Sequence, residues 1–72
     1  MISGSLIVHV KRINGAYVAR IQKTDFFSDR SRSRTEAVVS LCKALNQNLE
    51  RFRASSIERW TACTWFIQYH LL

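Results

Sequence analysis

The sequence predicts a small α+β domain in which a three-stranded antiparallel sheet packs on one long helix. Two β-rich runs separated by an Asn-Gly pair predict a hairpin, and a short aromatic run after them predicts a third strand. An apolar stripe with steps of three and four residues, beginning near residue 34, predicts the helix. A chain of 72 residues is long enough for one small domain, so residues 1–72 are expected to form a single unit.

The first two strands are predicted at residues 5–12 and 16–23. Between them, Asn14 and Gly15 favour a type I′ turn, which needs positive φ at both central positions. The turn sets the register of the hairpin. The expected partners are Arg12 and Tyr17, Lys11 and Val18, Val10 and Ala19, His9 and Arg20, and Val8 and Ile21.

This register gives the hairpin one apolar and one cationic face, because side chains alternate along each strand. The face predicted to join the core contains Leu6, Val8, Val10, Tyr17, Ala19 and Ile21. The opposite face contains His9, Lys11, Val18, Arg20 and Gln22. Both strands agree on which face is apolar, and this agreement supports the hairpin.

The third strand is predicted at residues 26–30, with either Phe26 or Phe27 facing the core. The long helix is predicted at residues 34–53. Ser33 and Glu36 have the spacing of a capping box, in which the two side chains satisfy free backbone N–H groups at a helix start. The apolar stripe of this helix consists of Val38, Leu41, Cys42, Leu45, Leu49 and Phe52.

Residues 57–70 are compatible with a second helix or a fourth strand. Ser55 and Glu58 offer a second capping box, which favours a helix. However, apolar residues in this segment recur both at helical spacing and in strict alternation, and many of them are β-formers. The helical set is Ile57, Trp60, Cys63, Ile67 and Leu71, and the alternating set is Cys63, Trp65, Ile67, Tyr69 and Leu71. We expect the helix because of the cap.

The positive charge of the chain is concentrated in residues 11–34. Seven of the eleven Lys and Arg residues lie there, with only Asp25 and Asp29 as acids, so this segment carries +5 of the net charge of +6. Cations that gather on one structural element are typical of a surface that binds a polyanion. The sequence therefore predicts a small basic domain that binds nucleic acid, with duplex DNA as the favoured ligand.

Two groups of side chains are candidates for this contact. The cationic face of the hairpin could reach phosphates or base edges, since a β-ribbon fits the major groove. The Arg-Ser alternation at residues 30–34, if extended, would space three guanidinium groups about 6.6 Å apart, close to the phosphate repeat of a strand. The alternative for both groups is an ordinary solvated surface. The expected binding residues are Lys11, Arg12, Arg20, Lys23, Arg30, Arg32 and Arg34.

Catalysis and metal binding have little support in the sequence. His9 and His70 lie on different predicted elements, and Cys42, Cys63 and His70 are separated by 20 and 6 residues, unlike structural zinc motifs. We therefore expect no enzyme, metal or cofactor. The run LIVHV at residues 6–10 is too short for a leader, and the apolar C-terminus is too short to span a membrane. We expect a cytoplasmic protein with two reduced, buried cysteines.

The hairpin, the short third strand and the long helix resemble the arm-type DNA-binding domain of phage tyrosine recombinases. The resemblance spans residues 6–53 and is carried by Arg12, Asn14, Gly15, Tyr17, Ala19 and Arg20, then the Arg-rich strand exit and Thr35-Glu36-Ala37. It implies that the exposed sheet face enters the major groove, as in the similar plant ethylene-response-factor domain. By position it implicates Lys11, Arg12, Arg20, Lys23, Arg30 and Arg32. The pattern also resembles HicB-type antitoxins and the core of double-stranded-RNA-binding domains.

Two functions are therefore considered. The first is a nucleic-acid-binding regulator of the kind that phages and mobile elements use. The second is a small protein-interaction factor, such as an antitoxin or a phage inhibitor of a host complex. In that case Trp60, Trp65 and Phe66 near the C-terminus would contact a protein partner or a second copy of the chain.

Overall fold

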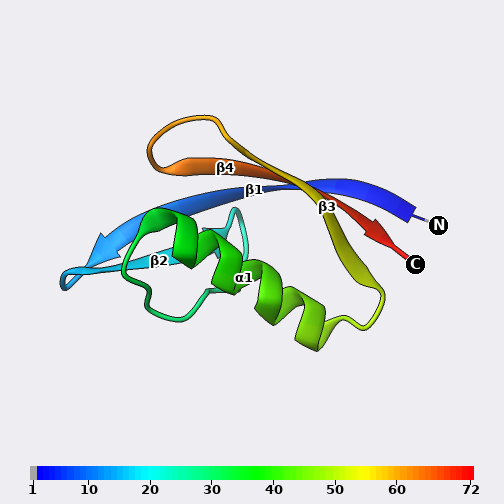
Figure 1. Ribbon diagram of the computed structural model, residues 1–72, viewed down its shortest axis with the longest axis horizontal. Coiled ribbons are helices and arrows are strands. Elements are labelled where there is room, and N and C mark those ends of the chain that lie inside the picture. Colours follow the sequence, from blue (N-terminus) through cyan, green and yellow to red (C-terminus); the bar gives the residue numbers. More distant parts are fainter. Residues whose placement is uncertain (1) are drawn as a thin grey trace.

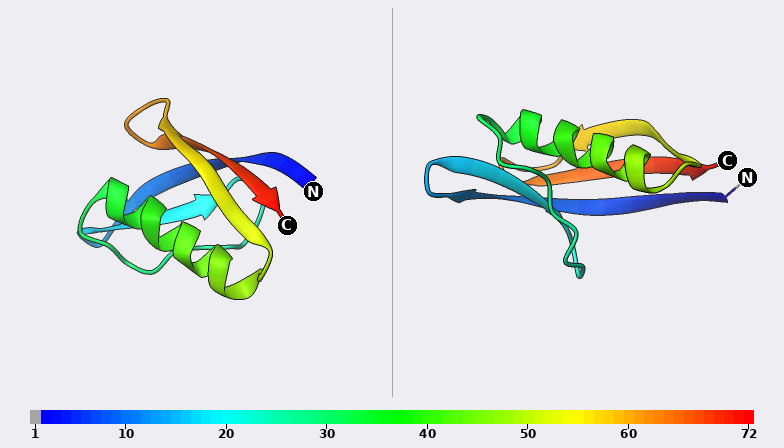
Figure 2. Two further views of the ribbon diagram at one scale, coloured as in Figure 1. Left: turned by 45° about the vertical axis from the view of Figure 1, so that its right-hand side comes forward. Right: turned by 90° about the horizontal axis from the view of Figure 1, so that it is seen from below.

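The computed structural model describes residues 2–72 and has the element order ββαββ (Figure 1). Its elements are β1 (Ile2–Ile13), β2 (Ala16–Ile21), α1 (Arg34–Asn48), β3 (Phe52–Arg59) and β4 (Thr64–Leu71). The strands form one antiparallel sheet in the order β2-β1-β4-β3, and α1 lies across one face of it (Figure 2). The α+β class is confirmed, but over residues 2–72 the sheet has four strands and there is one helix.

The predicted hairpin is confirmed together with its register. Val8 pairs with Ile21, His9 with Arg20, and Arg12 with Tyr17. Asn14 and Gly15 have φ values of 51° and 79°, as a type I′ turn requires. The two faces also separate as expected, since Val8, Val10, Ala19 and Ile21 are buried.

The third strand predicted at residues 26–30 is wrong. This segment runs beside β2 but makes only isolated bridges, from Phe27 to Arg20 and from Ser31 to Tyr17. Ser28 interrupts the ladder because its buried Oγ accepts the Ala19 N–H at 2.9 Å, a bond that a backbone carbonyl would accept in a regular strand. Of the two phenylalanines, Phe26 packs against the core and Phe27 is exposed, so the expectation that one faces inward is confirmed.

The helix begins where the sequence predicts and ends earlier. The Ser33 Oγ accepts the Glu36 N–H at 3.1 Å, which confirms the N-cap, while the Glu36 carboxylate accepts the Arg32 N–H. The predicted end at residue 53 is wrong, because α1 ends at Asn48. Phe52 still reaches the core that its helical spacing predicted, but it does so as the first residue of β3.

The second helix expected at residues 57–70 is also wrong. The segment belongs to a β-hairpin made of β3 and β4, in which Ser55 and Glu58 lie inside a strand and cap nothing. Trp65 and Ile67 are buried, as the alternating pattern predicted. The deciding interaction is distant in sequence, because β4 pairs with residues 2–9 of β1 and satisfies backbone groups that β2 does not reach.

The core lies between α1 and the sheet. The helix contributes five buried side chains, and all four strands contribute to the opposite wall of the core. The buried residues are Val8, Val10, Ala19, Ile21, Ala37, Val38, Leu41, Cys42, Leu45, Phe52, Trp65 and Ile67. No helix in residues 2–72 has the length and apolarity needed to cross a membrane.

Gly4 gives a test of the packing between β1 and β4. A Cβ on Gly4 would lie 2.5 Å from the Oη and 2.7 Å from the Cζ of Tyr69, whose ring stacks on Phe52 at 5.2 Å between centroids. We expect Gly4→Ala to lower the free energy of unfolding by about 1–3 kcal/mol, because the ring must leave this stack. This cost exceeds the gain of about 0.4–1 kcal/mol that loss of a glycine gives through the unfolded chain.

Urea unfolding followed by tryptophan fluorescence would measure the change. Ser5→Ala, at the adjacent exposed position, is the matched control and should leave stability unchanged. The Tyr69→Phe variant lacks the Oη atom that lies nearest to the new Cβ. In that background, Gly4→Ala should lower the free energy of unfolding by less than it does in the parent protein. Equal stability of Gly4→Ala and the parent protein would contradict this account of the contact.

Candidate nucleic-acid interface

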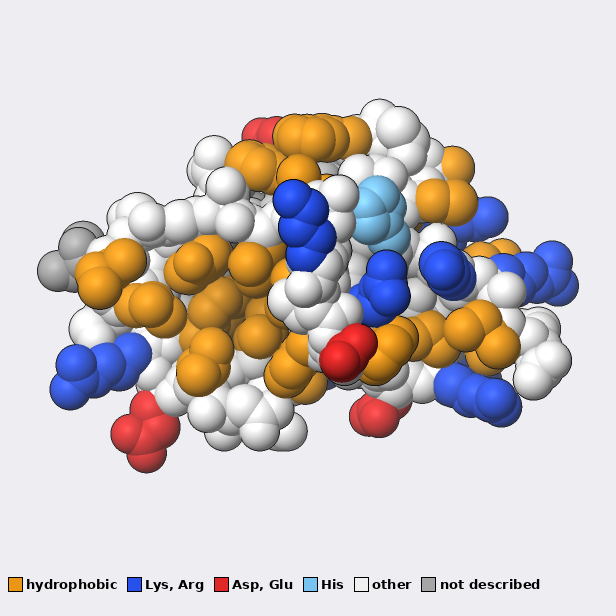
Figure 3. Space-filling model, turned by 180° about the vertical axis from the view of Figure 1, so that it is seen from behind, with side chains coloured by type: hydrophobic (Ala, Val, Ile, Leu, Met, Phe, Trp, Pro, Cys, Tyr) orange, Lys and Arg blue, Asp and Glu red, His pale blue; other side chains and the backbone are white. Residues whose placement is uncertain are grey.

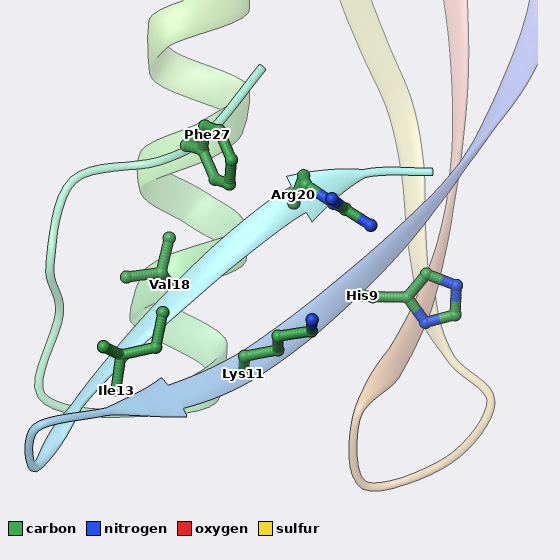
Figure 4. Close-up of a pocket in the computed structure, with 6 residues that line it drawn as sticks. All are labelled: His9, Lys11, Ile13, Val18, Arg20 and Phe27. Atoms are coloured by element: carbon green, nitrogen blue, oxygen red, sulfur yellow. The ribbon is translucent and has the colours of Figure 1, made fainter. Parts of the chain in front are cut away.

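The polar face of the β1–β2 hairpin is not covered by the helix. This open face carries His9, Lys11 and Ile13 from β1 and Val18 and Arg20 from β2 (Figure 4). The register places His9 directly opposite Arg20 and Lys11 opposite Val18. Figure 4 shows all five side chains, together with Phe27, on the side of the strands that looks away from α1.

These side chains surround a hollow of about 120 Å³ whose lining is mostly apolar. Ile13, Val18 and Phe27 supply the apolar surface, and Phe27 is 53% exposed. His9, Lys11 and Arg20 supply the polar part of the lining. An apolar surface beside cations can accept a flat or methyl-bearing group that is attached to an anion, which is the combination that a nucleotide presents.

A second depression, of about 590 Å³, adjoins the first at the edge of β1. The Val10 N–H donates to the Cys63 carbonyl at 2.8 Å, and no other described part of the chain pairs with β1 beyond this bond on the β4 side. Side chains from both faces of β1 therefore meet around the free edge. The depression is lined by His9, Val10, Lys11, Arg12, Ile13, Arg20, Arg34 and Cys63.

Four of these residues, Lys11, Arg12, Arg20 and Arg34, form what we call the cation cluster. No acidic side chain is among the residues that line either depression. The linings therefore carry positive charge only, and a concave surface lined by one sign of charge concentrates its field. Figure 3 shows most of the Lys and Arg side chains in the half of this view that holds the hairpin, while hydrophobic side chains dominate the half near the chain ends.

Two contacts define the setting of this cluster. The guanidinium of Arg34 lies over the ring of Tyr17, with its Cζ 4.9 Å from the ring centroid, so a cation–π contact orients it. In Arg20, the Nε atom is buried and has no hydrogen-bond partner within residues 2–72. A buried donor without an acceptor costs free energy, so this arrangement of Arg20 is unfavourable in the free protein.

The structure brings together only part of the predicted binding set. Lys23 lies in the turn after β2, with a φ of 64°, and Arg30 and Arg32 are exposed on the segment that leads to α1. The evenly spaced row expected from Arg30, Arg32 and Arg34 does not form, because Arg34 is the first residue of the helix. Lys23, Arg30 and Arg32 therefore flank the hairpin and do not continue it as a strand.

Two contributors were missing from the predicted set. His9 belongs to the cationic face that the register predicts, and its place opposite Arg20 was the signal for including it. Phe27 had no such signal, since its position depends on the irregular path of residues 26–31 along β2.

The two cysteines are free and differ in exposure. The prediction that both are buried is wrong for Cys63, which is exposed in the turn between β3 and β4, and right for Cys42. Burial raises the pKa of the Cys42 thiol, because the thiolate would lose its hydration among apolar groups. Within residues 2–72 there is no cluster of three or more His, Cys, Asp or Glu side chains that could hold a metal ion.

Comparison with known proteins gives no match for this chain. No family model matches it, and no curated protein or solved structure matches it at a significant level. The site must therefore be interpreted from its own geometry and charge.

The cysteines allow a test of the burial pattern. With Ellman's reagent, we expect Cys63 to react rapidly in the native protein and Cys42 to react slowly, because Cys42 is shielded and its raised pKa keeps the thiolate fraction low. Cys63→Ser should abolish the fast phase, and the slow phase should accelerate as pH rises toward the Cys42 pKa. Two thiols that react at the same fast rate would contradict this picture.

Proposed function

We propose that the protein is a nucleic-acid-binding module that holds duplex DNA against the β1–β2 hairpin. The observation that carries this proposal is the cation cluster around one concave surface without an acidic side chain. Three further cations, Lys23, Arg30 and Arg32, lie on segments adjoining the hairpin and extend the positive surface. Such a distribution favours a partner with regularly repeated negative charge.

Different side chains of the hairpin would have different roles. Lys11 and Arg20 project from the open face, so they would enter the groove and are the candidates for contacts to base edges. Arg12 and Arg34 lie at the free edge of β1 and would contact phosphates. Ile13, Val18 and Phe27 would give an apolar contact for a thymine methyl group or a sugar.

Arg20 has the strongest claim to a direct contact. It lines both depressions and stands opposite His9 on the open face of the hairpin. A phosphate or a guanine edge would supply an acceptor, and a guanidinium can bind either one through two parallel hydrogen bonds.

This function fits a small regulator of the type encoded by phages and mobile elements. Its cysteines are unpaired and one thiol is exposed, which suits a reducing compartment, and we propose a cytoplasmic location. No step of this proposal requires a cofactor or catalysis by the protein.

The test is fluorescence anisotropy with labelled duplex DNA, duplex RNA and single strands at several salt concentrations. For duplex DNA we expect saturable binding whose log K falls linearly with log salt, with a slope that corresponds to about 4–7 phosphates. The double variant Lys11→Ala, Arg20→Ala should bind at least about tenfold more weakly and should reduce that slope by about two phosphates.

The matched control is Lys43→Ala, Arg51→Ala. It removes the same charge from exposed positions on α1 and on the loop after it, away from the cation cluster, and should change binding far less. Equal losses for the two double variants would show that only net charge matters and would overturn the assignment to the hairpin. No saturable binding of any of the nucleic acids near physiological salt would overturn the function itself.

A second candidate function is protein interaction through the C-terminal aromatic residues. Trp60 is 55% exposed and stacks on Phe66, with ring centroids 4.9 Å apart, which forms an apolar surface at the turn between β3 and β4. Trp65 does not belong to this surface, because it is only 4% exposed and packs in the core. Trp60→Ser would weaken a protein complex while leaving DNA binding through the hairpin unchanged.

A further inference from the structure

Within residues 2–72, the sheet has one long edge that no other segment covers. β3 is the outermost strand on the side opposite β2, and its residues 53–59 are exposed except for the half-buried Ser56. By contrast, residues 26–31 run along the outer edge of β2 and bond to it. A free strand edge presents N–H and C=O groups that can pair with another strand.

The hydrogen bonds to β4 show which residues of β3 face outward. The Leu72 N–H donates to the Arg51 carbonyl, and the Trp60 N–H donates to the Thr64 carbonyl, so Arg51 and Trp60 face β4. Backbone groups alternate sides along a strand, and the β-bulge between Ala54 and Ser56 inserts one extra residue. The residues with outward-facing backbone groups are therefore Phe52, Ala54, Ile57 and Arg59. At Phe52 the N–H already donates to the Leu49 carbonyl at 3.0 Å and the carbonyl accepts from Arg53 Nη1, so the groups that remain for a partner are those of Ala54, Ile57 and Arg59.

The spacing of three residues between Ala54 and Ile57, where the others are two apart, decides which partner strand fits. A regular strand offers outward groups every second residue, so it falls out of phase at the bulge. A second copy of β3 has the same three-residue step and stays in phase when it runs antiparallel, with Ala54 opposite Ile57 of the other copy. In that register the outward groups of Ala54 and Ile57 meet twice, once on each side of the centre, while Arg59 lies opposite Phe52, whose backbone groups are bonded within its own chain.

We propose that the protein forms a homodimer by antiparallel pairing of β3 with β3 of a second copy in this register. Each Ala54–Ile57 pair would exchange two N–H···O bonds, giving four central backbone bonds around a two-fold axis perpendicular to the sheet. The axis keeps equivalent faces of the two sheets on the same side. The result is one sheet of eight strands with a helix from each copy on the same side.

Side-chain charge is complementary in the same register. Arg53 lies opposite Glu58 of the second copy, and the symmetry creates this pair twice. Both residues lie on the face away from α1. Their β4 partners are His70 and Phe66, which alternate with Trp65 and Ile67, the β4 residues that face the core. The Nη1 of Arg53 donates to the Glu50 and Phe52 carbonyls, at 3.1 Å and 2.7 Å, which leaves Nη2 and Nε for a carboxylate.

On the other face, the pairing would cover exposed apolar surface. Ile57 is 43% exposed and lies on the side of the sheet that faces α1, as does Ala54. Bulges and charged residues on an edge usually prevent pairing with an arbitrary strand. In β3 the bulge and the charged residues would exclude a regular strand, but they match the bulge and the charges of a second β3. The cation clusters remain uncovered, because β2 and the hairpin lie at the outer edges of the dimer.

Charge exchange tests this register. By sedimentation velocity over about 1–300 µM, we expect a concentration-dependent dimer, since edge pairing of this length buries a small area. Glu58→Arg and Arg53→Glu, each made singly, should raise the dimer dissociation constant at least about fivefold by placing like charges opposite each other. The double variant Arg53→Glu, Glu58→Arg restores opposite charges and should bring the constant back toward that of the parent protein.

Thermal unfolding of each variant, followed by circular dichroism at low concentration, confirms that the monomer folds. Ala54→Pro provides a second test, because it removes an outward N–H that β4 does not use and should abolish the dimer without unfolding the sheet. A protein that remains monomeric at the highest concentration overturns the proposal. A dimer that the single reversals leave unchanged, or one that Trp60→Ser alone disrupts, overturns it as well.

Discussion

The structure depends on β1 being hydrogen-bonded on both sides. Residues 8–13 pair with β2 and residues 2–9 pair with β4, so one strand sets the faces of both hairpins. Because side chains alternate with a period of two, placing Val8 and Val10 under α1 obliges His9 and Lys11 to face outward. A shift of one residue that turned β1 over would put Lys11 into the core and expose Val8 and Val10. Core packing therefore maintains the charged surface as a by-product of the register.

The shape of the cationic site follows from the unequal lengths of the strands. β1 has twelve residues, whereas β2 has six and β4 has eight, so β1 extends beyond β4 at the hairpin end. Around this projecting edge, side chains from both faces of the sheet and from the start of α1 converge on one depression. The aromatic ring of Tyr17 adds to this arrangement by holding Arg34 near the strand. The resulting surface combines cations with apolar side chains, a chemistry suited to a nucleotide chain more than to a simple anion.

The two surfaces that we propose as functional lie at opposite edges of the sheet. The hairpin edge is positively charged and concave. The β3 edge carries polar, apolar and charged residues in an order that is complementary to a second β3 running antiparallel. Separation of this kind would let a second copy bind without competing with a ligand on the hairpin. It would also double the cationic surface of one assembly, which strengthens binding to an extended polyanion through effective concentration.

The sequence by itself determined the features that depend on neighbouring residues. The Asn14-Gly15 turn dictates the hairpin register, and with it the pairing of His9 with Arg20, because a two-residue turn leaves no freedom of alignment. The Ser33 cap likewise follows from local hydrogen bonding. Tertiary structure decided the rest. Phe52 fits a helical stripe, and residues 57–70 fit two periodicities, so the local pattern does not decide between helix and strand. Residues 2–7 need a hydrogen-bonding partner, and β4 supplies it some sixty positions later in the chain. This pairing made the region a hairpin. The meeting of Arg34 with Lys11 around a free strand edge has the same origin, since it requires the path of residues 26–33 and the end of β4 to be in place.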